Sequence, residues 1–400
     1  MPAVYALRWW GSAQRFALTS PLLFTCCVTP PASPPPASAD GAAIEIIARP
    51  AARERTRGVV LVVLDGARWQ EVYGGVDRRR AHASGMNDAL VVDAKTLMPN
   101  LHAIIESRGV ALGAPGRAMV TASGPNFISL PGYTEILSGR ESVSCKDNDC
   151  PATVTPTLVD EIRSSVPAGE TGELADQEVA VISSWEPIGR VATARPATVV
   201  LSNGRHGGNH RELLRGDPTT AALLDDGERS DAWPGNADYR PDRFTGAIAT
   251  QYLKTHRPRF LFVGLGDTDE YGHHGDYPAY LRALTQADKV IGDIVTSLDA
   301  MGEDGKKTTL VITCDHGRAA DFRGHGGYAP ESGRAWLVMA GGGVHPRGFL
   351  DREETTRLRD IAPTIRVLMG LPNDDVRGAG QAIAGIWEQG EPVDRLATTR

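Results

Sequence analysis

The sequence predicts a doubly wound α/β sandwich, with a mostly parallel central sheet and helices on both faces. The first observation is a set of short, continuous apolar runs of the kind that parallel sheets bury on both faces. These runs are Gly58–Leu64, Glu178–Ile182, Phe260–Leu265, Thr309–Thr313 and Trp336–Met339. The second is a set of segments with apolar residues at helical spacing, namely Met98–Ser107, Tyr280–Met301 and Thr355–Met369. Strands that alternate with helices indicate this fold class.

The first 39 residues have the features of a secretory signal peptide. Two arginines precede the apolar stretch 16–28, and Ala37-Ser38-Ala39 supplies a small-residue cleavage site. We therefore expect an exported protein, periplasmic or secreted. A lipid anchor at Cys26 or Cys27 is the less favoured alternative, because phenylalanine and threonine precede Cys26 in a poor context for lipid attachment. A proline-rich leader without a targeting role is the third interpretation.

The remainder is predicted to form one domain. Residues 40–57 are expected to be a linker, 58–390 a catalytic domain, and 391–400 a tail. Residues 203–243 are polar and rich in Gly, Asp and Arg, so we expect an inserted loop there.

Composition restricts the partners. A net charge of −7 gives no basic footprint for nucleic acid and no polybasic patch for a membrane surface. The sequence shows no transmembrane segment beyond the signal peptide, whose apolar stretch is itself too short to span a bilayer comfortably. We therefore expect a small-molecule substrate.

Carboxylates and imidazoles follow three of the predicted strands. Since ligands of open α/β sheets gather at the carboxyl ends of strands, these side chains are expected to form one polynuclear metal site. The candidate ligands are Asp65, Asp269, His273, Asp315, His316 and His325. Three carboxylates and three imidazoles suit zinc best, with manganese and iron as alternatives. Six ligands can hold two divalent ions if water, substrate and a nucleophile complete the coordination. Asp267 is an alternative to Asp269.

A serine between the first carboxylate and the other ligands is the candidate nucleophile. Pro131 is suited to the first turn of a helix, which would place Ser129 at the helix N-terminus. Helix-start amides and a metal both favour an alkoxide there. An ordinary N-cap serine is the alternative interpretation.

Three cysteines follow the predicted signal peptide. Cys145 and Cys150 enclose a polar loop, Lys-Asp-Asn-Asp, and are expected to pair in an oxidising compartment. Cys314 lies in an apolar run and is expected to be a buried small hydrophobe.

The sequence resembles the alkaline phosphatase superfamily, which includes nucleotide pyrophosphatase/phosphodiesterases, cofactor-independent phosphoglycerate mutases and sulfatases. The resemblance rests on the order of the ligands, on Ser129-x-Pro131 followed by Leu-Ser-Gly-Arg140, and on a C-terminal Asp360-Ile-Ala-Pro-Thr segment. It implies an alkaline phosphatase-like sandwich over residues 58–385. It also implies a phosphoseryl intermediate at Ser129. One ion would be held by Asp269, His273 and His325, and the other by Asp65, Asp315, His316 and Ser129.

Departures from the family patterns narrow the choice of branch. Sulfatases carry Cys-x-Pro-x-Arg, whereas this chain has Ser129 and lacks the arginine, and mutases need a larger insertion than the one between Ser129 and Asp269. A sulfatase-like or phosphonate hydrolase activity and a non-catalytic metal-binding relic remain the alternatives. Phosphodiesterases and phosphomonoesterases are not separated.

Three residues downstream or upstream of the serine are candidate substrate contacts. Asn148 resembles the asparagine that contacts a phosphate oxygen in the diesterase branch, and Asn126 and Arg140 are further candidates. The alternative interpretations are a turn residue for Asn126 and a helix-end charge for Arg140.

Overall fold

The computed structural model describes residues 55–167, 175–373 and 378–387 of the chain. The predicted signal peptide, nearly all of the predicted linker and the predicted tail lie outside the described residues. The described residues belong to one compact unit.

The core of this unit is an eight-stranded sheet in the order β10-β2-β9-β7-β1-β6-β4-β5. β9 is antiparallel to both of its neighbours, and the other strands share one direction. A second sheet has the order β11-β3-β8. The strands are β1 (Gly58–Leu64), β2 (Gly109–Leu112), β3 (Val120–Thr121), β4 (Val179–Ser183), β5 (Val200–Asn203), β6 (Phe260–Leu265), β7 (Thr308–Thr313), β8 (Arg334–Ala335), β9 (Leu337–Gly341), β10 (Gly348–Phe349) and β11 (Thr356–Arg357).

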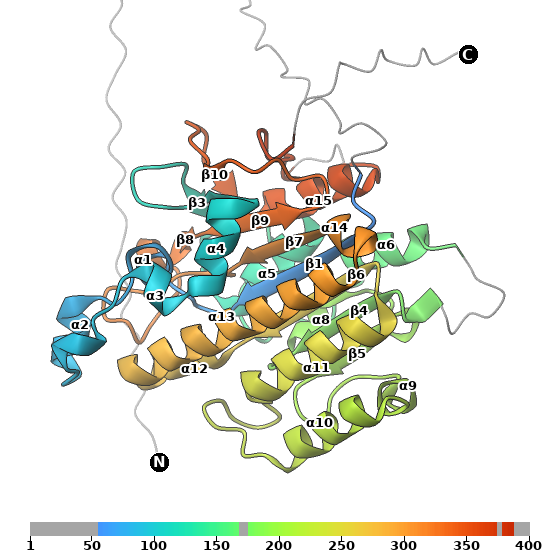
Figure 1. Cartoon of the computed structure of the whole chain (residues 1–400), viewed down its shortest axis with the longest axis horizontal. Coiled ribbons are helices and arrows are strands. Elements are labelled where there is room, and N and C mark those ends of the chain that lie inside the picture. The colour runs from blue at the N-terminus through green and yellow to red at the C-terminus, as the bar shows by residue number, and fades with distance from the viewer. Residues whose placement is uncertain (1–54, 168–174, 374–377, 388–400) are drawn as a thin grey trace, which may run out of the picture. The chain divides into compact units, whose positions relative to one another are not determined.

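Helices cover both faces of the large sheet (Figure 1). α4, α11 and α13 cross the face toward the viewer, and α5 and α8 lie behind the strands. Among the described helices, none combines the length and the apolarity needed to cross a membrane. The helices are α1 (Trp69–Gly74), α2 (Arg78–Ala83), α3 (Ala94–Leu97), α4 (Pro99–Ser107), α5 (Ser129–Ser138), α6 (Leu158–Ser165), α8 (Ile188–Ala192), α9 (Arg211–Arg215), α10 (Pro218–Arg229), α11 (Asp242–His256), α12 (Asp267–His274), α13 (Tyr277–Ala300), α14 (Glu303–Lys306) and α15 (Ile361–Met369).

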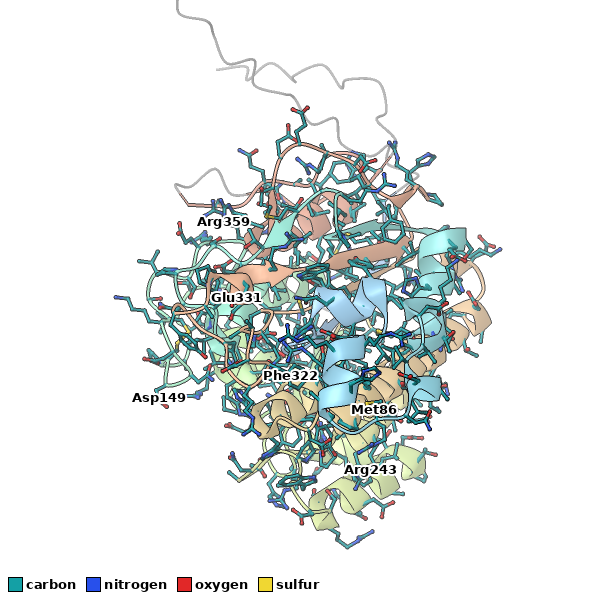
Figure 2. The ribbon with its side chains drawn as sticks, turned by 90° about the vertical axis from the view of Figure 1, so that its left-hand side faces the viewer. Met86, Asp149, Arg243, Phe322, Glu331 and Arg359 are labelled. Atoms are coloured by element: carbon teal, nitrogen blue, oxygen red, sulfur yellow. A yellow bond between two sulfur atoms is a disulfide. The ribbon has the colours of Figure 1, made fainter. Side chains whose placement is uncertain are left out.

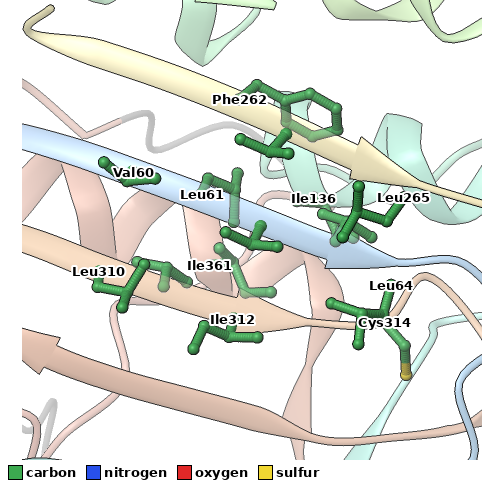
Figure 3. Packing of buried hydrophobic residues seen from close by; sticks show 14 of the residues in the cluster. Val60, Leu61, Leu64, Ile136, Phe262, Leu265, Leu310, Ile312, Cys314 and Ile361 are labelled. Carbon is green, nitrogen blue, oxygen red and sulfur yellow. The ribbon is translucent and has the colours of Figure 1, made fainter. Parts of the chain in front are cut away.

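The apolar runs that predicted the fold form the centre of the sheet. β1 is buried along its whole length between β6 and β7, which confirms the predicted α/β class. Figure 3 shows Leu61 of β1 beside Phe262 of β6 and Val60 of β1 beside Leu310 of β7, with Ile361 of α15 in the same cluster. Residues that interleave in this way exclude water from both faces of the sheet and fix the strand ends relative to one another.

Two expectations about local structure were wrong. The helix predicted from Thr355 begins only at Ile361, because Pro363 has no amide hydrogen and is tolerated only in the first turn. The segment 203–243, predicted as a loop, contains α9 and α10. Asp217 caps α10 by accepting from the amide of Thr220 at 2.8 Å, a helix-start signal that the polar composition obscured.

Glu135 is a buried carboxyl group on α5 whose ionisation opposes folding. Burial raises its pKa from 4.5 to about 7, although the amide of Ser123 donates to both carboxylate oxygens at 2.9 and 3.1 Å. Because the folded-state pKa lies above the unfolded-state value, the chain loses stability as the pH rises from about 4.5 to about 7.

We therefore expect Glu135→Gln to stabilise the protein at alkaline pH. Glutamine keeps an acceptor for the Ser123 amide and carries no charge, so the free energy of unfolding should rise by roughly 1–3 kcal/mol at about pH 8. At about pH 4.5 the wild-type carboxyl group is protonated in the folded state, and most of that gain should disappear. Urea unfolding of both proteins at the two pH values is the measurement, and an equal difference at both would contradict the assignment.

Candidate active site

The carboxyl ends of β1, β6 and β7 bring the predicted ligands to one edge of the sheet. The register pairs Leu64 with Leu265 and Val63 with Thr313, so the residues that follow these strands emerge side by side. The amide of Asp65 donates to the carbonyl of Leu265 at 2.8 Å. Figure 2 looks toward this edge, and Phe322, from the segment that follows β7, lies near its centre.

Asp269, His273 and His325 form the first group of candidate metal ligands, with one ligand atom from each lying within 4.8 Å of the others. Asp269 and His273 face the same side of α12 because they are four residues apart. Asp269 Oδ2 lies 2.9 Å from His273 Nε2, which is in turn 3.1 Å from His325 Nε2. The His273 side chain is 45% exposed, so this group has access to solvent.

Asp65, Asp315 and His316 form the second group, and all three are buried. His316 Nε2 lies 3.4 Å from Asp65 Oδ1 and 3.4 Å from Asp315 Oδ2. The rings of His316 and His325 stack with centroids 3.9 Å apart, so the two groups are neighbours.

The two stacked histidines are held with Nε2 toward the ligand groups. His316 Nδ1 lies 2.8 Å from the carbonyl of Gly317, and His325 Nδ1 lies 3.0 Å from the carbonyl of Phe127. A ring that donates from Nδ1 keeps its Nε2 lone pair free, which is the arrangement that metal-binding histidines require.

Burial shifts the protonation of the second group, and of His325 in the first, toward neutral forms. It lowers the pKa of His316 and of His325 to about 4, and it raises the pKa of Asp65 to about 7, helped by the charge of Asp269. Burial and the charge of Asp65 raise the pKa of Asp315 well above its usual range. Carboxylates crowded in this way are costly without a cation between them.

Ser129 is the first residue of α5 and lies against the second group. Its hydroxyl donates to Asp65 Oδ1 at 3.3 Å and lies 3.2 Å from His316 Nε2. Gly132 permits this approach, because a Cβ there would lie 2.4 Å from the carbonyl oxygen of Asp315. The N-cap residue, Ile128, offers no side-chain acceptor, so the serine is not an N-cap, contrary to the alternative interpretation.

Arg318 is a part of the site that the sequence did not reveal. Its guanidinium contacts Asp269 Oδ1 and also donates to the carbonyl of Phe322 at 2.5 Å. Burial raises the pKa of Asp269, but Arg318, together with the two nearby imidazoles, outweighs burial and holds that pKa well below its usual range. The carboxylate of Asp269 is therefore ionised, and its orientation is fixed by Arg318.

Tyr133 supports the second group from the next turn of α5. Its hydroxyl donates to Asp65 Oδ2 at 3.1 Å, which leaves Asp65 Oδ1 facing Ser129 and His316. We expect Tyr133→Phe to weaken metal binding about tenfold, because a ligand that loses its orienting partner typically costs that much. Competition with a chelator measures the affinity. Tyr252→Phe is the matched control, since the Tyr252 hydroxyl donates to the carbonyl of Gln177; equal, wild-type affinity in both variants would contradict the prediction.

The three candidate substrate contacts differ in their position relative to Ser129. Asn148 accepts at 3.1 Å from the amide of Leu130, next to the nucleophile. Asn126 lies in the turn before α5, where its carbonyl accepts from the amide of Ile128. Arg140 follows the far end of α5, about 15 Å from Ser129 along a helix that rises 1.5 Å per residue. This position agrees with the helix-end interpretation, and the assignment of Arg140 as a phosphate contact stays a prediction.

The alternative ligand Asp267 faces away from the first group. Its Oδ1 accepts from the hydroxyl of Tyr239 at 2.7 Å and from the amide of Asp242 at 3.2 Å. The segment 203–243 contacts the end of α12, because Trp233 stacks on His274, the neighbour of the candidate ligand His273, with ring centroids 4.3 Å apart.

Comparisons with known proteins agree with this geometry. A model of the Metalloenzyme superfamily matches residues 242–373, which carry five of the six candidate metal ligands. The chain is 30% identical over 122 residues to a 2,3-bisphosphoglycerate-independent phosphoglycerate mutase of Rippkaea orientalis, a match that covers 29% of this chain and 22% of the mutase. It is 27% identical over 130 residues to a phosphopentomutase of Clostridium kluyveri, covering 32% and 30%. Each match thus spans less than a third of the relative.

Solved structures extend the likeness to most of the fold. A variant of the alkaline phosphatase PafA has a TM-score of 0.55 at 12% identity, covering 84% of this chain and 99% of that one. A 2-O GAG sulfatase has a TM-score of 0.52 at 12% identity, covering 84% and 76%. Residues 242–373 thus match the Metalloenzyme superfamily, and most of the chain has the fold of these alkaline phosphatase and sulfatase structures.

Proposed function

We propose that the protein is a metal-dependent hydrolase of phosphate esters that acts through Ser129. The observation that carries the proposal is the placement of the Ser129 hydroxyl, 3.3 Å from Asp65 Oδ1 and 3.2 Å from His316 Nε2, at the N-terminus of α5. A hydroxyl between candidate metal ligands and helix-start amides has the environment that converts a feeble nucleophile into an effective one.

The donor set fits two divalent ions, zinc first. Asp315 Oδ2 is buried and has no hydrogen-bond partner among the described residues. A buried oxygen without a hydrogen-bond donor is expected where a cation is the partner. Mixed carboxylate and imidazole ligation suits zinc, and the exposed His273 leaves one group open to water or substrate. When bound, the ions would supply positive charge that lowers the pKa of a hydroxyl and neutralises phosphoryl oxygens.

The proposed reaction consists of two successive displacements at phosphorus. The Ser129 oxygen forms a bond to phosphorus while the bond to the leaving oxygen breaks, which gives phosphoserine and an alcohol. Water next attacks phosphorus, the serine oxygen leaves and takes a proton, and phosphate, or a phosphate monoester from a diester, is released. Asn148 lies where its amide can donate to a phosphoryl oxygen beside the Leu130 amide.

The residue at position 129 and the names of the matched relatives both favour phosphate esters over sulfate esters as substrates. Serine rather than cysteine occupies position 129. The relatives matched at 27–30% identity are named as a phosphoglycerate mutase and a phosphopentomutase, enzymes that move phosphoryl groups. Mono- and diesters are both within the proposal.

Export is part of the proposal. The disulfide between Cys145 and Cys150 confirms the expected pairing and supports an oxidising compartment. Cys314, the free cysteine of the described residues, is buried, as expected. Fractionation of cells should find the protein outside the cytoplasm, and a protein retained in the cytoplasm would contradict this part of the proposal.

The direct test combines metal analysis with three chromogenic esters. We expect about two divalent ions per chain and hydrolysis of p-nitrophenyl phosphate, bis-p-nitrophenyl phosphate or both, with p-nitrophenyl sulfate the poorest substrate. A chelator should remove the activity, and zinc should restore it. Metal-loaded protein that hydrolyses neither phosphate ester, or that prefers the sulfate, would overturn the proposal.

A further inference from the structure

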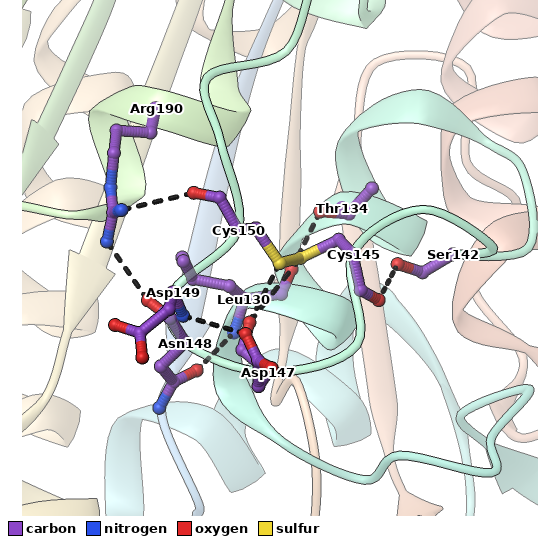
Figure 4. The surroundings of a disulfide bond; sticks show 9 residues. All are labelled: Leu130, Thr134, Ser142, Cys145, Asp147, Asn148, Asp149, Cys150 and Arg190. Atoms are coloured by element: carbon purple, nitrogen blue, oxygen red, sulfur yellow. Dashed lines mark hydrogen bonds between the residues drawn. A yellow bond between two sulfur atoms is a disulfide. The ribbon is translucent and has the colours of Figure 1, made fainter.

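The loop Cys145–Cys150 lies against the start of the nucleophile helix (Figure 4). The amide of Leu130 is in the first turn of α5, where amides lack partners within the helix. Asn148 Oδ1 accepts from this amide at 3.1 Å and thus caps the helix from another segment. None of the described residues accepts a hydrogen bond from Asn148 Nδ2, so that group remains available to a ligand beside Ser129.

The backbone around Asn148 is held from two sides. The disulfide between Cys145 and Cys150 closes the loop. Arg190 on α8 donates from one guanidinium nitrogen to the carbonyl of Asn148 at 3.0 Å and from another to the carbonyl of Cys150 at 3.1 Å. α8 packs on α5, so Arg190 ties the loop to the helix that carries Ser129.

The main chain of Arg190 also helps to hold this loop. The carbonyl of Arg190 accepts from the amide of Thr153 at 2.8 Å, so the same residue holds the chain on both sides of Cys150. The side chains of Asp147 and Asp149 are exposed, so packing contributes little to the order of the loop. Apart from two local hydrogen bonds, from the Asp149 amide to Asp147 Oδ1 and from the Ser142 hydroxyl to the carbonyl of Cys145, the cross-link and the arginine supply that order.

We infer that the Cys145–Cys150 disulfide and Arg190 form a clamp that positions Asn148 for phosphate binding. The inference rests on the proposed function and adds a positioning residue, Arg190, and a positioning disulfide. Without the clamp, Asn148 would sample positions away from the Leu130 amide, and small displacements of a binding group slow catalysis severely.

The alternative is that Asn148 and the clamp only stabilise the fold. A purely structural clamp would shift the unfolding temperature and leave turnover per folded molecule unchanged. A positioning clamp acts through one side chain, so its effect on turnover must vanish when that side chain is absent.

The experiment is a set of double-mutant cycles on the metal-loaded protein. The clamp is opened in two independent ways, by Arg190→Gln and by Cys145→Ala with Cys150→Ala, each in the wild-type and the Asn148→Ala backgrounds. Val143→Ala is the matched control, since Val143 precedes the loop and is 74% exposed. The readouts are kcat and KM for the preferred phosphate ester, metal content and unfolding temperature.

We expect each clamp variant to lower kcat/KM about tenfold with full metal content, and to change it less than twofold in the Asn148→Ala background. Equal losses in both backgrounds, or no loss from either clamp variant, would overturn the inference while the proposed function stands. Wild-type protein without Ser129-dependent turnover would overturn both.

Discussion

Ser129→Ala is expected to abolish the hydrolysis of phosphate esters while the fold is kept and the six other candidate ligands still hold the ions. The serine oxygen is the atom that forms the bond to phosphorus, and alanine offers no replacement. The loss in kcat should reach about a thousandfold or more, the usual scale when a nucleophile is removed. Purified wild type and variant are compared with the preferred ester, with metal analysis and thermal unfolding beside the kinetics.

Ser138→Ala is the control for this change. Ser138 ends the same helix, and its hydroxyl contacts the carbonyl of Arg140 rather than a candidate metal ligand. We expect its activity to remain near that of the wild type. A Ser129→Ala protein that retains more than about a tenth of the activity would show that another group attacks phosphorus.

Asp315→Asn is expected to have the second largest effect, a loss of both bound metal and turnover. Asp315 is fully buried at the end of β7, and its Oδ2 has no hydrogen-bond partner among the described residues. Asparagine preserves the size of the side chain and can still accept from the amide of Gly66, as Asp315 Oδ1 does at 3.1 Å. It removes the negative charge that a divalent ion needs, so at least one ion and nearly all activity should be lost.

The same change should stabilise the metal-free protein. A buried carboxyl group crowded by Asp65 opposes folding, and a neutral amide of the same shape does not. Unfolding temperatures in excess chelator should therefore be higher for Asp315→Asn than for the wild type. Asp321→Asn, at an exposed position of the segment that follows β7, should alter neither metal content nor stability. Full metal content in Asp315→Asn would contradict its assignment as a ligand.

The features that could be predicted from the sequence are those that depend on a run of neighbouring residues. Runs such as Gly58–Leu64 show a parallel strand because every position is apolar, and the carboxylates that follow such strands must meet at one edge of the sheet. For this reason the six candidate ligands could be chosen before their contacts were known. Strand register brings Asp65 and Asp315 together, whereas His273 and His325 reach the site through α12 and through the segment that follows β7.

Contacts that depend on tertiary packing could not be predicted, because no local sequence pattern indicates them. Arg318 follows the motif Asp315-His316-Gly317, but its pairing with Asp269 depends on the path of the chain between β7 and β8. The hydrogen bond from Tyr133 to Asp65 requires that α5 be close to the end of β1. The helix-end position of Arg140 could be expected from the motif, but what its side chain contacts could not.

Phosphate on Ser129 during turnover would be the most direct sign that this serine is the nucleophile. Metal-loaded protein is mixed with a phosphate monoester, quenched in acid, digested and examined by mass spectrometry. We expect a phosphoryl group on the peptide that contains Ser129, absent from the Ser129→Ala protein and from protein without substrate. Steady turnover with phosphate on another residue, or with none on Ser129 at any quench time or pH, would contradict it.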